Sequence, residues 1–227
     1  MNKRNKTSPK AVRLERERQQ RRKAIIDVAR RFFIEYGYDD AMVDKIALEV
    51  GYTKVTIYNY FESKDDLFVA VVAGVYEKLY RVMDTHLKRE DVMYELRSMG
   101  EAYVIFFEKY PEDALLFEVG RLSVVTSIIR RKIAINEELT ESEREFNKQM
   151  ALIEELMTSV ITETLKSSGV QSKVEPFSVI MVLSTFAQAI RTLVTRGRMS
   201  DSPDESTREY LDVFFTIIDK GLRHYDD

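Results

Sequence analysis

The chain has 227 residues, 44% hydrophobic and 32% charged, so it is long enough to bury one or two cores and is not disordered as a whole. It contains no cysteine, which excludes disulfides, thiolate metal sites and cysteine nucleophiles. Its longest apolar run, residues 67–76, is about half of what a membrane span needs. We therefore expect a cytoplasmic protein with no membrane partner.

The net charge of −3 hides an uneven distribution of charge along the chain. Residues 1–31 contain twelve Lys or Arg and only three acidic residues, a net charge of +9. Residues 1–64 together carry +6, so the rest of the chain carries −9. A basic end on an acidic body indicates that this end contacts a polyanion, although a merely solvated basic tail would have the same composition.

In chain order, residues 1–12 lack apolar periodicity and are expected to form a flexible basic arm. A first helix follows and is expected to end at Gly37. The next is a two-turn helix ending at Gly51, with one apolar face formed by Val43, Ile46, Ala47 and Val50. Since Ala41 and Met42 offer no hydroxyl to cap it, we expect Asp40 to cap this helix instead.

Two capping patterns mark the next helix starts. Thr53 can cap a short third helix, and Ser63 with Asp66 forms a capping-box pattern that begins a longer fourth helix. Later helices are expected near residues 91–110, 112–135, 140–168, 176–197 and 205–223. The sequence therefore predicts an all-α fold: a helix-turn-helix domain over 13–62 and a larger helical domain over 63–227.

Residues 41–67, AMVDKIALEVGYTKVTIYNYFESKDDL, closely resemble the DNA-binding signature of the TetR family of transcriptional regulators. The pattern combines matches at fixed spacing: Ile46-Ala47, Gly51, Thr56, Tyr58, Tyr60-Phe61, Ser63-Lys64 and Leu67. The resemblance covers roughly residues 18–75. It implies an N-terminal three-helix reader of operator DNA and a C-terminal domain that binds a ligand and forms a homodimer.

The resemblance points to eight residues for DNA contact. Thr53, Lys54, Val55 and Asn59 would face base edges, and Thr56, Tyr58, Tyr60 and Lys64 would bind the DNA backbone. Physically, Lys54 and Lys64 stand at the first position of a helix, where a cation opposes the helix dipole and a phosphate would compensate it; they could also simply be solvated. Tyr58 and Tyr60 lie off the Ile57–Phe61 apolar face, so phosphate contact competes with packing as their role.

The resemblance also implies a ligand pocket in the second domain. Aromatic and methionine side chains there could line it, although most must be ordinary core: Tyr103, Phe106, Phe107, Tyr110, Phe117, Met150 and Met157. Arg121 and Gln188 are candidate polar anchors. Such a pocket would suit a lipophilic ligand.

Dimerisation is expected through the last two helices, whose apolar faces could form an isologous four-helix interface. The candidates are Phe186, Ala189, Ile190 and Leu193 on one helix and Leu211, Phe214, Phe215, Ile218 and Leu222 on the other. The alternative is that these faces pack within one subunit.

The expected function is thus a ligand-responsive DNA-binding regulator, in the simplest case a repressor released from its operator when a small molecule shifts the fourth helix. A nonspecific architectural DNA-binding protein is the alternative. An enzyme is not expected, because the chain has only two histidines, His86 and His224, and no glycine-rich phosphate loop or metal-ligand cluster. No cofactor or metal is expected.

Overall fold

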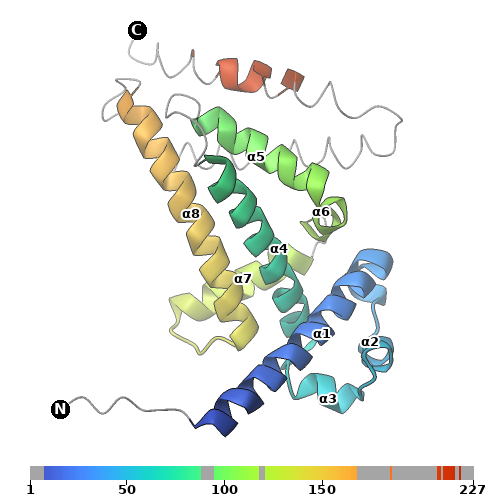
Figure 1. Ribbon diagram of the computed structural model, residues 1–227. Helices are drawn as coiled ribbons and strands as arrows, with labels where there is room; N and C mark the ends of the chain where they lie inside the picture. Colours follow the sequence, from blue (N-terminus) through green and yellow to red (C-terminus); the bar gives the residue numbers. More distant parts are fainter. Residues whose placement is uncertain are drawn as a thin grey trace, which may run out of the picture. The chain divides into compact units, whose positions relative to one another are not determined.

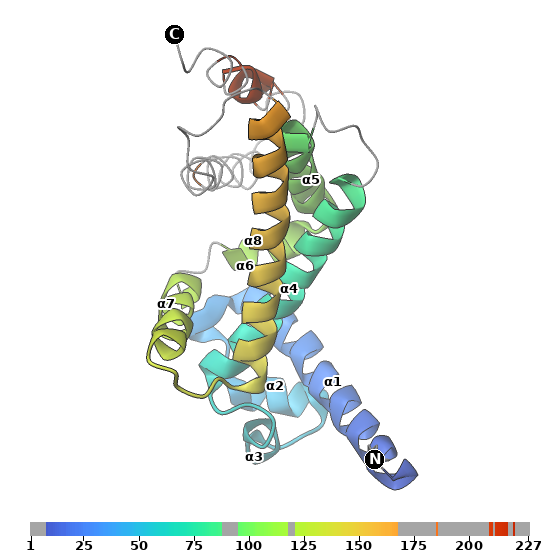
Figure 2. The same ribbon diagram turned by 90° about the vertical axis from the view of Figure 1, so that its left-hand side faces the viewer.

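The computed structural model describes residues 8–87, 95–117 and 121–167, together with 185, 209–210, 212–217 and 220. Regular structure in these residues is helical, which confirms the all-α fold (Figures 1 and 2). The helices are α1 (Pro9–Asp40), α2 (Val43–Val50), α3 (Lys54–Tyr58), α4 (Lys64–Leu87), α5 (Glu95–Lys109), α6 (Pro111–Phe117), α7 (Arg121–Ala134) and α8 (Glu141–Ser167). The single helix expected over 112–135 is therefore two helices, α6 and α7.

The chain forms two compact units. Unit 1 comprises Met1–Val72 and Val119–Glu145, and unit 2 comprises Ala73–Glu118 and Phe146–Asp227. Consequently α4 and α8 each begin in unit 1 and end in unit 2. Unit 1 is larger than the 13–62 segment expected for the DNA-binding domain, because α7 and the start of α8 fold with it. Among the described helices, none combines the length and apolar content needed to cross a membrane.

Helix α1 begins earlier than the sequence predicts. Ser8 caps it by accepting a hydrogen bond from the Ala11 backbone N–H at 3.2 Å, and Pro9 occupies the first turn, where its fixed φ suits a helix start. Residues 9–12, expected in the flexible arm, are therefore helical. Near its other end Gly37 interrupts the helix with φ +74° and ψ 174°, which agrees with the expected stop there.

The helix-turn-helix is formed by α2 and α3. Gly51 ends α2 in the left-handed conformation, with φ +80°, as the sequence predicts. Thr53 caps α3 by accepting the Thr56 N–H at 3.2 Å. The prediction that Asp40 caps α2 is wrong: Met42 occupies the cap position and no side chain caps the helix, because Asp40 is still the last residue of α1.

The core of unit 1 joins α1, α2, α3 and the start of α4. Three aromatic rings form its centre: Phe33 meets Phe68 edge to face at 5.3 Å, and Tyr38 lies within 6 Å of both. The buried residues around them are Ile25, Ala29, Val43, Ile46, Ala47, Ile57, Phe61 and Leu67. This packing fixes how α3 is presented to solvent.

The described part of unit 2 has its own aromatic core. Phe106 and Phe107 of α5 are fully buried and contact each other edge to face, with Tyr103 and Tyr110 beside them. In the same unit, Tyr76 of α4 packs against Phe146 of α8 at 5.1 Å. Lys78 of α4 pairs with the buried Asp113 of α6 at 2.8 Å, which supplies the partner that a buried carboxylate requires.

Candidate nucleic-acid interface

Helix α3 presents nearly all of its surface to solvent. Of its five residues only Ile57 is buried, where it anchors the helix to the core. Val55 is 71% exposed and Tyr58 41% exposed. Helix α3 therefore leaves an aliphatic and a phenolic side chain accessible beside the cation Lys54.

Six of the eight predicted DNA-contact residues lie on α3 or immediately beside it, at Thr53, Lys54, Val55, Thr56, Tyr58 and Asn59. Thr53 and Thr56 also bond each other through their hydroxyls at 2.9 Å, which orders both side chains. Their remaining hydrogen-bonding capacity faces solvent, since Thr53 is exposed and Thr56 half-buried.

Lys54 has an intramolecular partner that sequence reasoning missed. Its ammonium group donates to Asp44 Oδ2 at 2.8 Å, and this hydrogen bond, followed by the charge of Asp44, raises the pKa of Lys54. Asp44 lies in the first turn of α2, where a carboxylate also suits the helix dipole. The cation at the start of α3 is therefore already compensated without DNA, although both side chains remain exposed.

Lys64 is also engaged within the chain. Its ammonium group donates to the backbone carbonyl of Asp39 at 3.0 Å and lies 4.6 Å from the centre of the Tyr38 ring. A cation beside the last carbonyls of α1 is favourable because it meets the negative end of that helix. Lys64 thus joins the end of α1 to the start of α4, and its predicted phosphate contact is not needed to explain its position.

Tyr58 and Tyr60 differ in their surroundings. Tyr58 is exposed, as a phosphate-binding phenol would be. Tyr60 is half-buried, and the guanidinium of Arg18 on α1 lies 5.8 Å from its ring centre. This contact places a second cation beside the predicted backbone-contact residues.

Two exposed apolar residues of this region were missed by the sequence analysis. Leu48 of α2 is 80% exposed and Met42, just before α2, is 53% exposed. The signal was available, because Leu48 falls off the i, i+3, i+4 apolar face that buries Ile46 and Ala47. With Val55, these side chains make the helix-turn-helix surface apolar as well as cationic.

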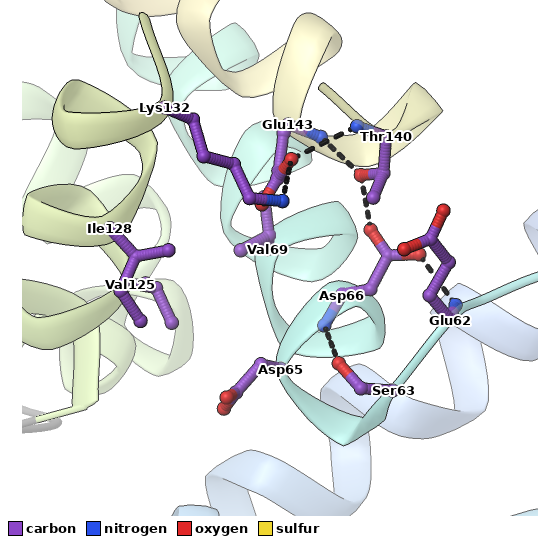
Figure 3. A pocket seen from close by; sticks show the side chains of 10 residues that line it. All are labelled: Glu62, Ser63, Asp65, Asp66, Val69, Val125, Ile128, Lys132, Thr140 and Glu143. Carbon is purple, nitrogen blue, oxygen red and sulfur yellow. Dashed lines mark hydrogen bonds and ion pairs between the residues drawn. The ribbon is translucent and has the colours of Figure 1, made fainter. Parts of the chain in front are cut away.

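Behind the helix-turn-helix, the start of α8 is tied to the start of α4. Thr140 and Glu143 form a reciprocal capping box: Thr140 Oγ1 accepts from the Glu143 N–H at 3.1 Å, and Glu143 Oε2 accepts from the Thr140 N–H at 2.9 Å (Figure 3). Thr140 Oγ1 also donates to Asp66 Oδ1 at 2.6 Å. Asp66 in turn accepts from the Glu62 N–H, so one carboxylate joins the two helix starts.

Lys132 of α7 completes this group, which we call the capping network: Asp66, Lys132, Thr140 and Glu143. Its ammonium group is 3.0 Å from both carboxylate oxygens of Glu143. Burial favours a lower pKa for Lys132, but the hydrogen bond and charge of Glu143 outweigh it and raise that pKa. The network borders a cavity of about 150 Å³ whose walls also include Val69, Val125 and Ile128 (Figure 3).

Helix α1 is held by the same turn. Arg22 is buried, donates to Ser142 Oγ at 3.0 Å and lies over the Phe61 ring. Arg18 and Gln19 donate to the Glu141 carboxylate at 3.1 and 3.2 Å. Burial favours a higher pKa for Glu141, but these hydrogen bonds and the arginine charges outweigh it and lower the pKa. Residues 140–143 therefore form hydrogen bonds with both α1 and α4, the helices that flank the helix-turn-helix in the sequence.

The predicted pocket residues are only partly brought together. Phe106 and Phe107 are core residues, Tyr103, Tyr110, Met150 and Met157 are half-buried, and of these Tyr110 alone lines a described cavity of unit 2. The side chains of Phe117 and Arg121, and all of Gln188, lie outside the described residues. A buried amide not foreseen from the sequence is Gln149 of α8, whose Oε1 has no hydrogen-bond partner in the described structure. No group of acidic or histidine side chains there is arranged to hold a metal ion.

Most of the predicted dimer residues lie outside the described residues: Phe186, Ala189, Ile190, Leu193, Leu211, Ile218 and Leu222. Phe215 is buried within its own subunit and packs against the half-buried Phe214. The apolar residues that the described part of this helix exposes are Tyr210, Val213 and Ile217, spaced i, i+3, i+7. Phe214 and Phe215 are the predicted dimer residues that the structure describes, so the interface on the last two helices stays a prediction.

Comparison with known proteins agrees with this geometry. Residues 25–71 match the model of the bacterial regulatory proteins, tetR family. An HTH-type transcriptional repressor of Mycobacterium tuberculosis is 37% identical over 79 residues, which are 35% of this chain and 40% of that repressor. The chain therefore matches about two fifths of the length of that relative.

Two further similarities extend over most of the chain. The fatty acid metabolism regulator protein of Bacillus subtilis is 23% identical over 178 residues, covering 78% of this chain and 85% of that protein. The structure of FadR from Bacillus subtilis in complex with stearoyl-CoA superposes with a TM-score of 0.59 and 17% identity, covering 88% and 98% of the two chains. At that identity the structural likeness shows the fold.

Proposed function

We propose that this chain, whose residues 25–71 match the tetR family model, is a transcriptional regulator of that family that binds operator DNA as a homodimer and is released by a small lipophilic molecule. The N-terminal half of this proposal rests on unit 1 and the C-terminal half on unit 2. The two are argued separately below.

The observation that carries the DNA-binding proposal is the exposed surface of α3. A helix of five residues buries Ile57 alone and offers Lys54, Val55 and Tyr58 to solvent. A short helix of this kind fits the major groove, where Val55 can contact a thymine methyl group and the flanking cation and phenol can reach phosphates. Thr53 and Asn59 lie at its two ends and can donate to base edges.

The packing that holds α3 in a fixed orientation supports sequence-specific DNA binding rather than nonspecific binding to DNA phosphates. Base contacts give discrimination only when the reading side chains are held in a fixed register. Here the reader is fixed by the aromatic core of unit 1 and by residues 140–143, which fasten α1 and α4. An architectural protein that binds phosphates alone has no need of this arrangement.

Four observations support a lipophilic effector bound by unit 2. The full-length relative from Bacillus subtilis is a fatty acid metabolism regulator, and the similar FadR structure holds stearoyl-CoA. In unit 2, the α5 core is rich in aromatic side chains, and the buried carbonyl oxygen of Gln149 has no hydrogen-bond partner among the residues that the structure describes. Helix α4 belongs to both units, so a shift of this helix on ligand binding is the proposed route of release.

Dimerisation is proposed because one short recognition helix reads only a few base pairs, and two copies are needed for a site of useful length. The exposed Tyr210, Val213 and Ile217 provide an apolar face for the second copy. We place the interface on the last helix, with these residues added to those selected from the sequence.

The experiment is a selection of the purified protein against random duplex DNA, followed by competition at fixed salt. We expect one enriched, palindromic sequence that is retained over random duplex by about a thousandfold or more. A protein that enriches no sequence, or that random duplex displaces equally well, is not the proposed regulator. Adding acyl-CoA thioesters of different chain lengths to the bound complex then tests release.

A further inference from the structure

A second cavity, of about 380 Å³, lies in unit 2 between α4 and the end of α5. We call it the basic cavity. Five of its residues form a single stripe along α4, spaced i, i+3, i+4, i+7 and i+8: Lys78, Arg81, Val82, Thr85 and His86. Ile105, Lys109 and Tyr110 form the other wall. Its volume is within the range of small-molecule sites.

The residues that line the basic cavity include three cationic side chains. Lys78, Arg81 and Lys109 are basic, and none of the eight lining residues is acidic. Lysines and arginines from two helices repel one another when they converge, so their convergence costs stability unless an anion joins them. Since the chain after residue 64 carries a net charge of −9, a cluster of three basic residues in this part of the chain runs against its overall charge.

Two of these cations form ion pairs with acidic residues that do not line the cavity, whereas the third has no acidic partner in the described structure. Lys78 pairs with the buried Asp113, and Arg81 pairs with Glu77 on its own helix. Lys109 contacts only a ring in the described structure, with its ammonium group 5.4 Å from the centre of Tyr110. The negative end of α5 explains why a lysine suits that turn, but not why it faces Lys78 and Arg81.

His86 supplies a second, independent observation. Its Nε2 atom is buried and has no hydrogen-bond partner in the described structure, and the nearest carboxylate oxygen, on Glu101, is 3.7 Å away. Buried polar atoms without partners are few in folded proteins, and a bound ion or water is one explanation for such an atom. This atom belongs to a residue that lines the basic cavity.

The remaining walls define the rest of the ligand. Val82 and Ile105 are apolar, and the Tyr110 ring offers a face for stacking. Thr85 adds a hydroxyl that can donate to an anionic oxygen. A guanidinium, two ammonium groups and a hydroxyl match the several oxygens of a phosphate group better than the two of a carboxylate.

We propose that the basic cavity binds the phosphate group of an organic anion, with Lys109 as its principal partner, Arg81 as a second partner shared with Glu77, and Val82, Ile105 and Tyr110 against its apolar or aromatic portion. The site stands on the geometry of unit 2. Only one part of the proposal rests on the proposed function, namely that the bound anion belongs to the effector molecule.

The test is isothermal titration of the full-length protein, in the absence of DNA, with inorganic pyrophosphate in one arm and dodecanoate in the other, at matched ionic strength. We expect saturable binding of pyrophosphate. Arg81→Gln and Lys109→Gln should each weaken it about tenfold, the loss of one charge-assisted hydrogen bond. Lys148→Gln is the matched control, because it removes one exposed cation of the same unit outside the cavity.

Each other outcome overturns the proposal. Absence of pyrophosphate binding up to about 10 mM excludes the site. Equal weakening by Lys148→Gln shows general charge attraction, and binding of dodecanoate alone, weakened by Lys109→Gln, assigns the cavity to carboxylates. Thermal unfolding of each variant verifies that it is folded. Because no DNA is present, failure here leaves operator binding intact, and failure of operator binding leaves this result unchanged.

Discussion

Thr140 Oγ1 donates a hydrogen bond to Asp66 Oδ1 at 2.6 Å, although 74 residues separate them. Asp66 lies in the first turn of α4 and Thr140 immediately precedes α8. The start of α4, which follows the helix-turn-helix, is therefore hydrogen-bonded to the start of α8. The next prediction tests what this bond contributes to folding.

Replacing Thr140 by Val removes the cap of α8 and the donor to Asp66. We expect the free energy of unfolding to fall by about 2 kcal/mol, because both a capping bond and a buried carboxylate's partner are lost. Urea denaturation followed by circular dichroism measures it. Thr126→Val is the control: that hydroxyl only donates back to the Leu122 carbonyl in α7, so a change of less than about 0.5 kcal/mol is expected.

The lowered pKa of Glu141 predicts how stability depends on pH. A carboxyl whose pKa is lower in the folded state than its ordinary 4.5 stabilises the fold above that value, and the gain is lost as pH falls through the folded pKa. Wild type should therefore be more stable than Glu141→Gln at pH 7, by less than about 1 kcal/mol because the carboxylate is partly exposed. The difference should shrink towards pH 3; a constant difference would contradict the assignment.

The ion pair of Lys54 with Asp44 predicts an unusual gain of DNA affinity. Asp44→Asn removes a negative charge beside α3 and releases the Lys54 ammonium group for a phosphate. Binding to all duplexes should strengthen, and the dependence of log K on log salt should steepen by about one. Titrations at several salt concentrations measure this. Glu154→Gln removes an exposed acid of unit 2 and should leave the slope unchanged.

Lys64 is predicted to act on both stability and DNA binding. Lys64→Gln should lower the free energy of unfolding by about 1 kcal/mol, since the carbonyl of Asp39 loses its cationic donor. If the ammonium group also reaches a phosphate, the salt slope should become shallower by about one. A folded, less stable variant with an unaltered slope would restrict Lys64 to its role inside the protein.

Gly37 and Gly74 should respond in opposite directions to alanine. Gly37 has φ +74° and ψ 174°, a conformation that only glycine adopts without strain, so Gly37→Ala should destabilise by about 1–3 kcal/mol. Gly74 lies inside α4, and a Cβ there meets nothing within 4 Å. Gly74→Ala should stabilise by up to about 1 kcal/mol. Thermal unfolding of both variants compares the two directly.

Local signals predicted the helix-turn-helix accurately because short-range chemistry determines it. Gly51 ends α2 and Thr53 caps α3 as the spacing indicated, and Ile57 is the buried anchor of α3. The start of α1 was also readable, since Ser8-Pro9 is a helix-start signal. The basic composition of the surrounding residues nevertheless favours a flexible arm, and for this reason the sequence analysis predicted the helix start too late.

Long-range partners could not be read in this way. Asp44 for Lys54 and the Asp39 carbonyl for Lys64 depend on how α2 and α1 pack, which no spacing of residues encodes. The capping box at Thr140 and Glu143 was visible as Thr-x-x-Glu, but its bond to Asp66 was not. The basic cavity could not be predicted either, because a stripe of cations on one face of α4 has the sequence pattern of an ordinary solvated helix face.

Residues 119–145 belong to unit 1, and this affects how the DNA-binding domain could be fused to the ligand-binding domain of another regulator. A graft that joins this reader to a foreign sensor at residue 62 would discard Ser142 and Glu141, leaving Arg22 buried without its acceptor and Arg18 without its carboxylate. A transplantable reader from this chain would have to bring along a second, distant piece of sequence. Chimeras in which the ligand-binding domain is exchanged at residue 62 should therefore fold poorly.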